Sequence, residues 1–250
     1  MQTVVDNLAI EYTDQGTGPV VLMLHGWGDN LHTFDPLLQY ISKYRVVRLD
    51  LPGFGNSLRS EATWGVVEYA RFVQSFIKKL QIDPQVVVGH SFGGRVIIKG
   101  VGVGIFAPQK IVLIASAGVA RKTTIKSLVL RLFAKIGKAL TLIPPLSIYR
   151  QQLRKKLYGA IGSDYFAAGA MRDVFLKVVR EDLVHYARQI RVPTLLIWGS
   201  EDTATPLTEG ETIRDAIRQS ELEVIQGATH FVHQEKPHEV ASLIREFIGQ

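Results

Sequence analysis

The fold is decided by the stretch Val86-Val87-Val88-Gly89-His90-Ser91-Phe92-Gly93-Gly94. Three β-branched residues predict a buried strand, and the apolar, glycine-spaced run 92–106 predicts a buried helix. Between them stands the pattern Gly-x-Ser-x-Gly, with Ser91 at the turn. So tight a turn needs positions without side chains, which Gly89 and Gly93 supply, and it strains the serine backbone. The turn should lift the Ser91 hydroxyl clear of the sheet, where the helix N-terminus favours developing negative charge.

Length and composition predict one globular domain. The chain has 250 residues, of which 46% are hydrophobic, enough to bury a sizeable core with a lobe inserted into it. Cysteine is absent, which excludes a disulfide framework, a thiolate metal site and a cysteine nucleophile. The N-terminal sequence has no signal-peptide pattern, and charges interrupt the apolar runs before they reach the length of a membrane span. We therefore expect a soluble, cytoplasmic protein.

The positive charge is concentrated in one segment. The formal net charge is +6, yet residues 119–188 alone carry fourteen Lys and Arg against four Asp and Glu. The rest of the chain is therefore slightly acidic, so any anionic partner should meet that segment.

Strand and helix patterns alternate along most of the chain. Apolar or β-branched runs predict strands at 3–5, 9–12, 20–24, 45–49, 86–88, 111–115, 194–198 and 222–225. Helical spacing appears at 34–41, 64–80, 92–106, 211–218 and 237–248. This alternation predicts an α/β fold with a mostly parallel, doubly wound sheet. Residues 119–188 contain only helical patterns, so we expect a core domain of residues 1–118 and 189–250 with an inserted helical cap at 119–188.

Two late loops carry the groups that a serine nucleophile needs. In parallel sheets the chemistry lies in loops outside the carboxyl ends of the strands. Asp202 follows the predicted strand 194–198, and His230 follows the predicted strand 222–225. Glu201 is adjacent to Asp202 and is a second candidate for the acid.

With the order Ser91, Asp202, His230, the chain resembles the α/β-hydrolase superfamily, in particular serine hydrolases with a helical cap, such as carboxylesterases and lipases. The stretch Asp50-Leu51-Pro52-Gly53-Phe54-Gly55-Asn56-Ser57 also resembles a signature of that family. The resemblance implies that Ser91, Asp202 and His230 form a catalytic triad. It also implies an oxyanion hole made by the backbone N–H groups of Phe92 and Trp27. A serine at position 91 disfavours the branches of the family that attack with a carboxylate.

Four other histidines have different interpretations. His25 is expected to hold the oxyanion loop in shape, and His90 to be structural. His233 lies near His230 in the sequence, but without nearby cysteine or a His-Glu-x-x-His helix a metal pair is a poor hypothesis. His238 is expected on the surface of the last helix. No metal or cofactor is expected. The glycine run 100–104 could suggest a phosphate-binding loop, but it has no Gly-Lys-Ser ending, and we expect it to permit close helix-to-sheet packing.

The cap segment contains a basic amphipathic helix. Its apolar stripe predicts a substrate pocket formed by Leu128, Leu132 and Phe133, together with Phe231 beside His230. The other faces carry Lys126, Arg131, Lys135 and Lys138. One interpretation is a lid with solvated charges, and the other is a surface that meets anionic lipid or an acidic substrate. Nucleic acid is not expected, because aromatic residues are not interleaved with the charges.

The leading functional hypothesis is a serine hydrolase that cleaves a small to medium apolar carboxylic ester through an acyl-enzyme. A carbon–carbon bond hydrolase or a perhydrolase of the same fold stays open, and so does a hydrolase-fold ligand receptor with weak turnover. Specificity resides in cap contacts that no motif records. The sequence therefore leaves the substrate and the oligomeric state undetermined.

Overall fold

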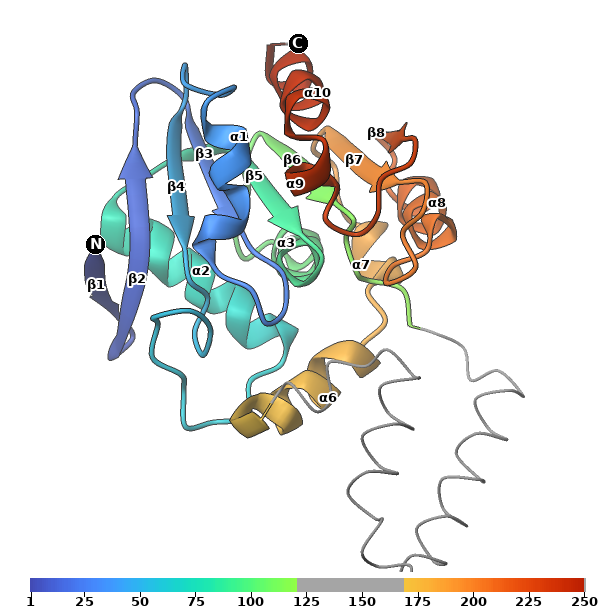
Figure 1. The fold of residues 1–250 in the computed structure, drawn as a ribbon. Coiled ribbons are helices and arrows are strands. Elements are labelled where there is room, and N and C mark those ends of the chain that lie inside the picture. Colours follow the sequence, from blue (N-terminus) through green and yellow to red (C-terminus); the bar gives the residue numbers. More distant parts are fainter. Residues whose placement is uncertain (121–168, 250) are drawn as a thin grey trace, which may run out of the picture.

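An eight-stranded sheet organises the chain in a computed structural model that describes residues 1–120 and 169–249 (Figure 1). The strands are β1 (Gln2–Val5), β2 (Leu8–Gln15), β3 (Val20–Leu24), β4 (Arg45–Leu49), β5 (Pro84–His90), β6 (Lys110–Ile114), β7 (Thr194–Gly199) and β8 (Ser220–Ile225). Their spatial order is β1-β2-β4-β3-β5-β6-β7-β8. The β1–β2 and β2–β4 pairs are antiparallel, and every later pair is parallel. The predicted mostly parallel α/β fold is confirmed.

Helices cover both faces of the sheet. They are α1 (Asp35–Leu38), α2 (Val66–Leu80), α3 (Phe92–Val103), α6 (Arg172–Arg180), α7 (Val184–Ala187), α8 (Leu207–Ala216), α9 (Val232–Glu235) and α10 (Pro237–Gly249), with short 3₁₀ turns at Leu31–Phe34 and Gly169–Met171. Apolar residues of α2, α3, α7 and α8 form one buried cluster with the sheet, and those of α1, α9 and α10 form another. Side chains alternate along the central strands, so Leu22 joins the first cluster while Val21 and Met23 join the second. A sheet buried on both faces explains the continuous apolar runs of its strands.

Several local predictions differ from the structure: β2 extends to Gln15 and α8 begins at Leu207, and two further differences have a visible cause. The first helix begins as a 3₁₀ turn at Leu31, because the Asn30 side chain accepts a hydrogen bond from the His32 N–H and starts the turn early. The run 100–104 makes a different contact from the predicted helix-to-sheet packing. A Cβ added to Gly102 would lie 2.5 Å from the Tyr186 carbonyl oxygen of α7, and one added to Gly100 would lie 2.2 Å from the Phe106 ring. These two glycines permit close approach to α7 and to the segment after α3.

The cap prediction falls mainly on residues 121–168, which lie outside the described part of the chain. Leu128, Leu132 and Phe133 are among them, as are the basic residues Lys126, Arg131, Lys135 and Lys138. Of the predicted segment, the structure describes α6, α7 and the residues beside them. In Figure 1, α6 lies beyond the carboxyl ends of the central strands. Leu183 precedes α7 and Ala187 is its last residue. Both are fully buried in the cluster around α3.

Two buried cations fasten the end of α6 to α3. The Arg95 guanidinium donates to the carbonyl oxygens of Val178, at 2.7 Å, and of Glu181. The Lys99 ammonium lies 2.6 Å from the Glu181 carboxylate and over the Tyr186 ring. Burial lowers the pKa of Arg95 to about 10. The helix that follows Ser91 therefore also holds α6 in place.

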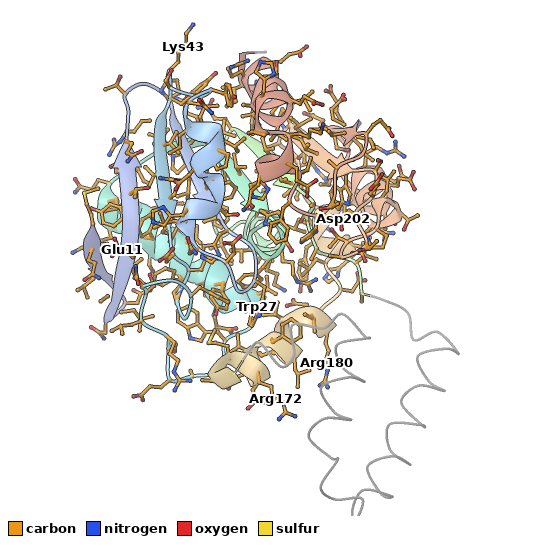
Figure 2. All side chains as sticks on the ribbon, viewed as in Figure 1. Glu11, Trp27, Lys43, Arg172, Arg180 and Asp202 are labelled. Atoms are coloured by element: carbon orange, nitrogen blue, oxygen red, sulfur yellow. The ribbon has the colours of Figure 1, made fainter. Side chains whose placement is uncertain are left out.

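The outer surface of α6 is basic. Figure 2 shows Arg172 and Arg180 extending from α6, and both residues are exposed. Within residues 1–120 and 169–249, none of the helices is both long enough and apolar enough to cross a membrane.

Candidate active site

Ser91 occupies a strained turn between β5 and α3. Its φ of 48° and ψ of −103° place a non-glycine residue at positive φ, as the Gly-x-Ser-x-Gly pattern predicts. A Cβ added to Gly93 would lie 2.1 Å from the Leu24 carbonyl oxygen, and one added to Gly89 would lie 2.6 Å from the Gly93 backbone. Neither position has room for a side chain, so the predicted role of both glycines is confirmed. The Ser91 N–H donates to the Ile114 carbonyl oxygen of β6 at 3.0 Å, which ties the turn to the sheet.

Asp202 and His230 form a hydrogen-bonded pair at the neighbouring strand ends. The Nδ1 atom of His230 lies 2.8 Å from the Oδ2 atom of Asp202, whose side chain is fully buried while that of His230 is 16% exposed. Burial opposes the charge of Asp202, but the hydrogen bonds from His230 and Thr205 outweigh it and lower the pKa of this carboxyl. Glu201, the other candidate acid, is exposed. The geometry favours Asp202 as the partner of the histidine.

His90 links the histidine loop to the serine turn. Its Nε2 atom donates to the His230 carbonyl oxygen at 3.0 Å, and the two rings lie 4.9 Å apart. His90 directly precedes Ser91, so the loop after β8 is fixed against the turn after β5. No hydrogen bond joins the Ser91 hydroxyl to the His230 ring, a contact that in hydrolases of this kind commonly tightens only in the complex with substrate.

The loop after β3 lies against the same turn. His25 donates from Nδ1 to the Gly26 carbonyl oxygen at 2.7 Å and accepts at Nε2 from the Leu51 N–H at 2.9 Å. These two partners fix one neutral tautomer, and burial lowers the pKa of His25. A Cβ added to Gly26 would lie 2.8 Å from the His90 Nδ1 atom and 3.5 Å from the Ser91 Cβ atom. His25 thus holds this loop in shape, as the sequence predicts.

The two residues predicted to supply oxyanion donors are neighbours. The Trp27 and Phe92 rings meet edge to face with centroids 5.4 Å apart. Their backbone N–H groups therefore belong to adjacent segments, one in the loop after β3 and one at the first residue of α3.

Aromatic side chains surround this part of the site, and the sequence reasoning identified only some of them. Phe231 is 42% exposed, and its ring packs 5.4 Å from the His90 ring and 5.5 Å from the His230 ring. The Phe175 ring of α6 lies 5.1 Å from the Trp27 ring, and the sequence reasoning missed it. Its three-residue spacing from Val178 is the available signal, but spacing does not tell which helix face meets the site.

His90 and His233 form a buried pair beneath His230. Their ring centroids are 4.4 Å apart, and His233 shares a hydrogen bond of 2.9 Å with the Thr33 hydroxyl. Burial lowers the pKa of His233 to about 3, with a further contribution from His230, and lowers the pKa of His90 well below its ordinary value. Both rings are therefore neutral at physiological pH. Within residues 1–120 and 169–249 there is no cluster of three His, Cys, Asp or Glu residues suited to a metal ion.

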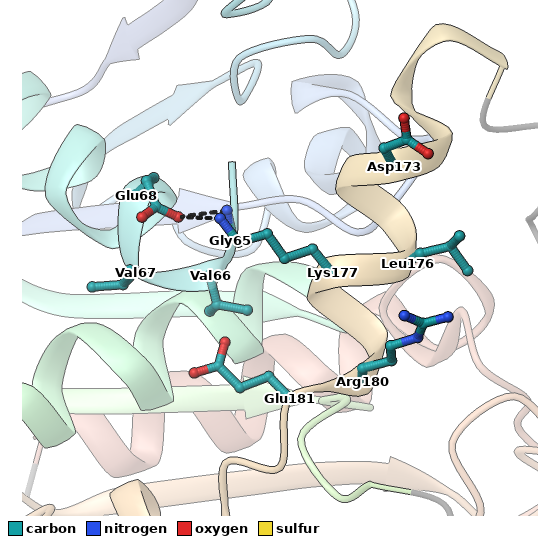
Figure 3. Close-up of a pocket in the computed structure, with 9 residues that line it drawn as sticks. All are labelled: Gly65, Val66, Val67, Glu68, Asp173, Leu176, Lys177, Arg180 and Glu181. Carbon is teal, nitrogen blue, oxygen red and sulfur yellow. Dashed lines mark hydrogen bonds and ion pairs between the residues drawn. The ribbon is translucent and has the colours of Figure 1, made fainter. Parts of the chain in front are cut away.

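A separate open groove of about 670 Å³ lies between the start of α2 and α6 (Figure 3). Lys177 crosses it to donate to the Thr63 carbonyl oxygen at 3.0 Å and lies 3.6 Å from the Glu68 carboxylate. The predicted catalytic residues do not line this groove.

Comparison with known proteins agrees with this architecture. The sequence profile of the Alpha/beta hydrolase family matches residues 21–243. The AB hydrolase superfamily protein YisY of Bacillus subtilis is 27% identical over 97% of this chain and 96% of its own. Monoacylglycerol lipase ABHD6 of Rattus norvegicus is 26% identical over 94% of this chain and 76% of its own.

A solved structure shows the same fold. The crystal structure of a bacterial membrane phospholipase A superposes with a TM-score of 0.78 at 24% identity, covering 100% of this chain and 85% of the other. The family profile spans most of the sequence, and the strand order agrees with it. The chain therefore belongs to the alpha/beta hydrolase family.

Proposed function

We propose that this alpha/beta hydrolase is a serine hydrolase that cleaves carboxylic esters with small to medium apolar acyl groups. The observation that carries the proposal is the hydrogen-bonded Asp202–His230 pair, held by His90 against the strained turn of Ser91. A neutral hydroxyl is a weak nucleophile, and a histidine oriented by a buried carboxylate is the usual base that activates it.

The proposed reaction has two halves. The Ser91 oxygen attacks the ester carbonyl carbon while His230 takes the hydroxyl proton, and Asp202 stabilises the resulting imidazolium. The Trp27 and Phe92 N–H groups donate to the oxyanion of the tetrahedral intermediate. When the intermediate collapses, the ester C–O bond breaks and His230 returns the proton to the departing alcohol. Water then repeats these steps on the acyl-enzyme and releases the carboxylic acid and free Ser91.

The preference for apolar acyl groups is supported by the surroundings of the turn. Trp27 and Phe175 pack together beside Phe92, and Phe54 joins them with its ring 4.8 Å from the Trp27 ring. Burying an acyl chain against such rings is favourable at about 0.8 kcal/mol per methylene. The relationship to a monoacylglycerol lipase supports the same bond type.

A p-nitrophenyl ester series from acetate to octanoate tests the proposal, combined with a fluorophosphonate probe. We expect turnover and labelling in the wild type, and loss of both in the Ser91→Ala variant. Labelling that survives in Ser91→Ala would contradict Ser91 as the nucleophile. Labelling of Ser91 without turnover of any ester would contradict ester hydrolysis and favour the carbon–carbon hydrolase or receptor hypothesis.

The adjacent residues Glu201 and Asp202 provide a matched test of which carboxylate orients His230. Asp202→Asn should reduce kcat on the order of 10³-fold or more, because the amide favours the wrong histidine tautomer and leaves the imidazolium without a counter-charge. Glu201→Gln removes one negative charge from the same loop at an exposed side chain and should change kcat little. Equal losses in both variants would contradict the assignment.

A further inference from the structure

We propose that Thr205 is a positioning residue, whose hydroxyl holds the Asp202 carboxylate in the orientation that receives His230. The inference rests on the proposed function, because it assigns Thr205 a role in the same triad. Thr205 lies three residues after Asp202 in the loop following β7, and it is buried. It was not among the residues that the sequence reasoning selected.

The Thr205 hydroxyl stands among three polar atoms of the site. Its Oγ1 atom lies 2.8 Å from the Oδ2 atom of Asp202, 3.2 Å from the Nδ1 atom of His230 and 3.1 Å from the Ala115 carbonyl oxygen. The Thr205 hydroxyl therefore contacts both Asp202 and His230 at once. Ala115 directly follows β6, so the same hydroxyl also bridges to the neighbouring strand end.

Asp202 has all its acceptor positions filled in this arrangement. An ionised carboxylate offers about four acceptor positions. The Oδ1 atom accepts from the N–H groups of Ala204 and Thr205, each at 2.8 Å. The Oδ2 atom accepts from His230 and from the Thr205 hydroxyl, also at 2.8 Å each. Two of these four donors belong to Thr205, so removing its hydroxyl leaves one position of a fully buried carboxylate unpaired.

The single hydroxyl proton decides which acceptor is served. Asp202 Oδ2 and the Ala115 carbonyl oxygen are both acceptors, and a hydroxyl can donate fully to only one. Asp202 is closer and charged, and a hydrogen bond to a charged acceptor is roughly twice as strong as a neutral one. The Thr205 hydroxyl therefore donates its hydrogen bond to Asp202. Its oxygen stays available to accept from the His230 Nδ1–H.

The Thr205 backbone is anchored independently of its hydroxyl. Its N–H donates to Asp202, and its carbonyl oxygen accepts from the indole N–H of the fully buried Trp198 at 2.8 Å. Because both backbone groups are engaged, the side chain is presented in a fixed direction. A substitution that removes only the hydroxyl should leave this backbone in place.

The test compares Thr205→Val, which replaces the hydroxyl by a methyl group of similar shape, with Thr205→Ser, which keeps the hydroxyl. Thr203→Val is the matched control, because Thr203 is an exposed threonine in the same loop. We would measure kcat and KM on the preferred ester, the rate of fluorophosphonate labelling at Ser91, and the downfield ¹H NMR signal of the His230 Nδ1 proton.

Thr205→Val should lower kcat and the labelling rate at least about tenfold, the loss expected for one hydrogen bond to a buried charge. KM should change little, since the group does not touch substrate. The Nδ1 proton signal should shift or broaden in Thr205→Val. Thr205→Ser should restore the rates and the signal, and Thr203→Val should match the wild type.

Three results would overturn the role of Thr205. Wild-type rates and an unchanged signal in Thr205→Val would show that the hydroxyl does not position Asp202. Equal losses in Thr205→Ser and Thr205→Val would assign the effect to the methyl group. If Thr205→Val fails to fold, Thr205→Ser against Thr205→Ala repeats the comparison, and equal behaviour of this pair would refute the role. Failure of the proposed function looks different, because the wild type would then turn over no ester, with or without labelling of Ser91, while the NMR comparison still tests Thr205.

Discussion

Buried His233 makes the stability of this protein depend on pH in a direction that the structure specifies. Its side chain is fully buried, and burial together with the nearby His230 lowers its pKa to about 3. In the unfolded chain the same ring has the ordinary histidine pKa of about 6.5. Between these two values the unfolded state binds one more proton than the folded state. The free energy of unfolding therefore falls as the pH falls through this window.

The size of the effect follows from the two pKa values. One proton of difference changes the free energy of unfolding by about 1.4 kcal/mol per pH unit, so His233 alone costs about 2 kcal/mol between pH 6.5 and pH 5.0. His25 and His90 have lowered pKa values as well, and they act in the same direction. The His233→Gln variant removes one of these three contributions, and its amide can still reach the Thr33 hydroxyl.

Equilibrium urea unfolding at pH 7.5, 6.5, 5.75 and 5.0 measures this dependence. We expect the wild type to lose about 2 kcal/mol more than His233→Gln between pH 6.5 and pH 5.0. His238→Gln is the control, because His238 is exposed on α10, and its slope should equal that of the wild type. Parallel pH dependences in the wild type and His233→Gln would refute the conclusion that His233 is buried as a neutral ring.

Three further predictions concern single contacts. Phe175→Ala removes the ring that packs on Trp27, so KM for octanoate should rise severalfold while KM for acetate changes little, as the ester series measures. Gly26→Ala places a Cβ 2.8 Å from the His90 Nδ1 atom, so kcat should fall about tenfold or more in a protein that still folds by circular dichroism. Glu181→Gln leaves the Lys99 ammonium without its ion pair and should lower the free energy of unfolding by about 1–3 kcal/mol in urea titrations.

The parts of the fold that depend on local periodicity were predictable from the sequence. The strands β3 and β4 have the predicted bounds, because continuous apolar runs flanked by turn residues leave little ambiguity. The serine turn was equally predictable from the Gly-x-Ser-x-Gly pattern, although only Gly89 is required by backbone contacts a few residues away, whereas the Leu24 carbonyl that excludes a side chain at Gly93 lies on another strand. The acid and the histidine followed from their places after two late strands.

The contacts around the triad were less predictable, because they join residues far apart in the chain. His233 is two residues from exposed Phe231, yet it packs on His90 and bonds to Thr33, 200 residues earlier. Thr205 and Phe175 likewise acquire their neighbours only when loops and helices from separate strands meet. Periodicity assigns a residue to a helix or a loop, but it does not identify the partner across the sheet.

The geometry of the site follows from the register of the parallel strands. β5, β6, β7 and β8 are adjacent in the sheet, so their carboxyl ends meet at one edge. Each neighbouring pair of ends is also joined by a side chain or backbone hydrogen bond. Ser91 bonds from β5 to Ile114 of β6, the Ala115 N–H after β6 donates to Ile197 of β7, and Asp202 after β7 bonds to His230 after β8.

His90 joins the last loop to the first through the His230 carbonyl oxygen, which completes a ring of contacts across the strand ends. In a closed ring, a shift at one contact must be absorbed by the others, whereas an open chain of contacts would let the outer loop move freely. The proposed base, His230, is therefore positioned by two routes, one through Thr205 and Asp202 and one through His90. Loss of either route should weaken the alignment of His230 without abolishing it, whereas loss of both should affect kcat by more than the product of the separate effects.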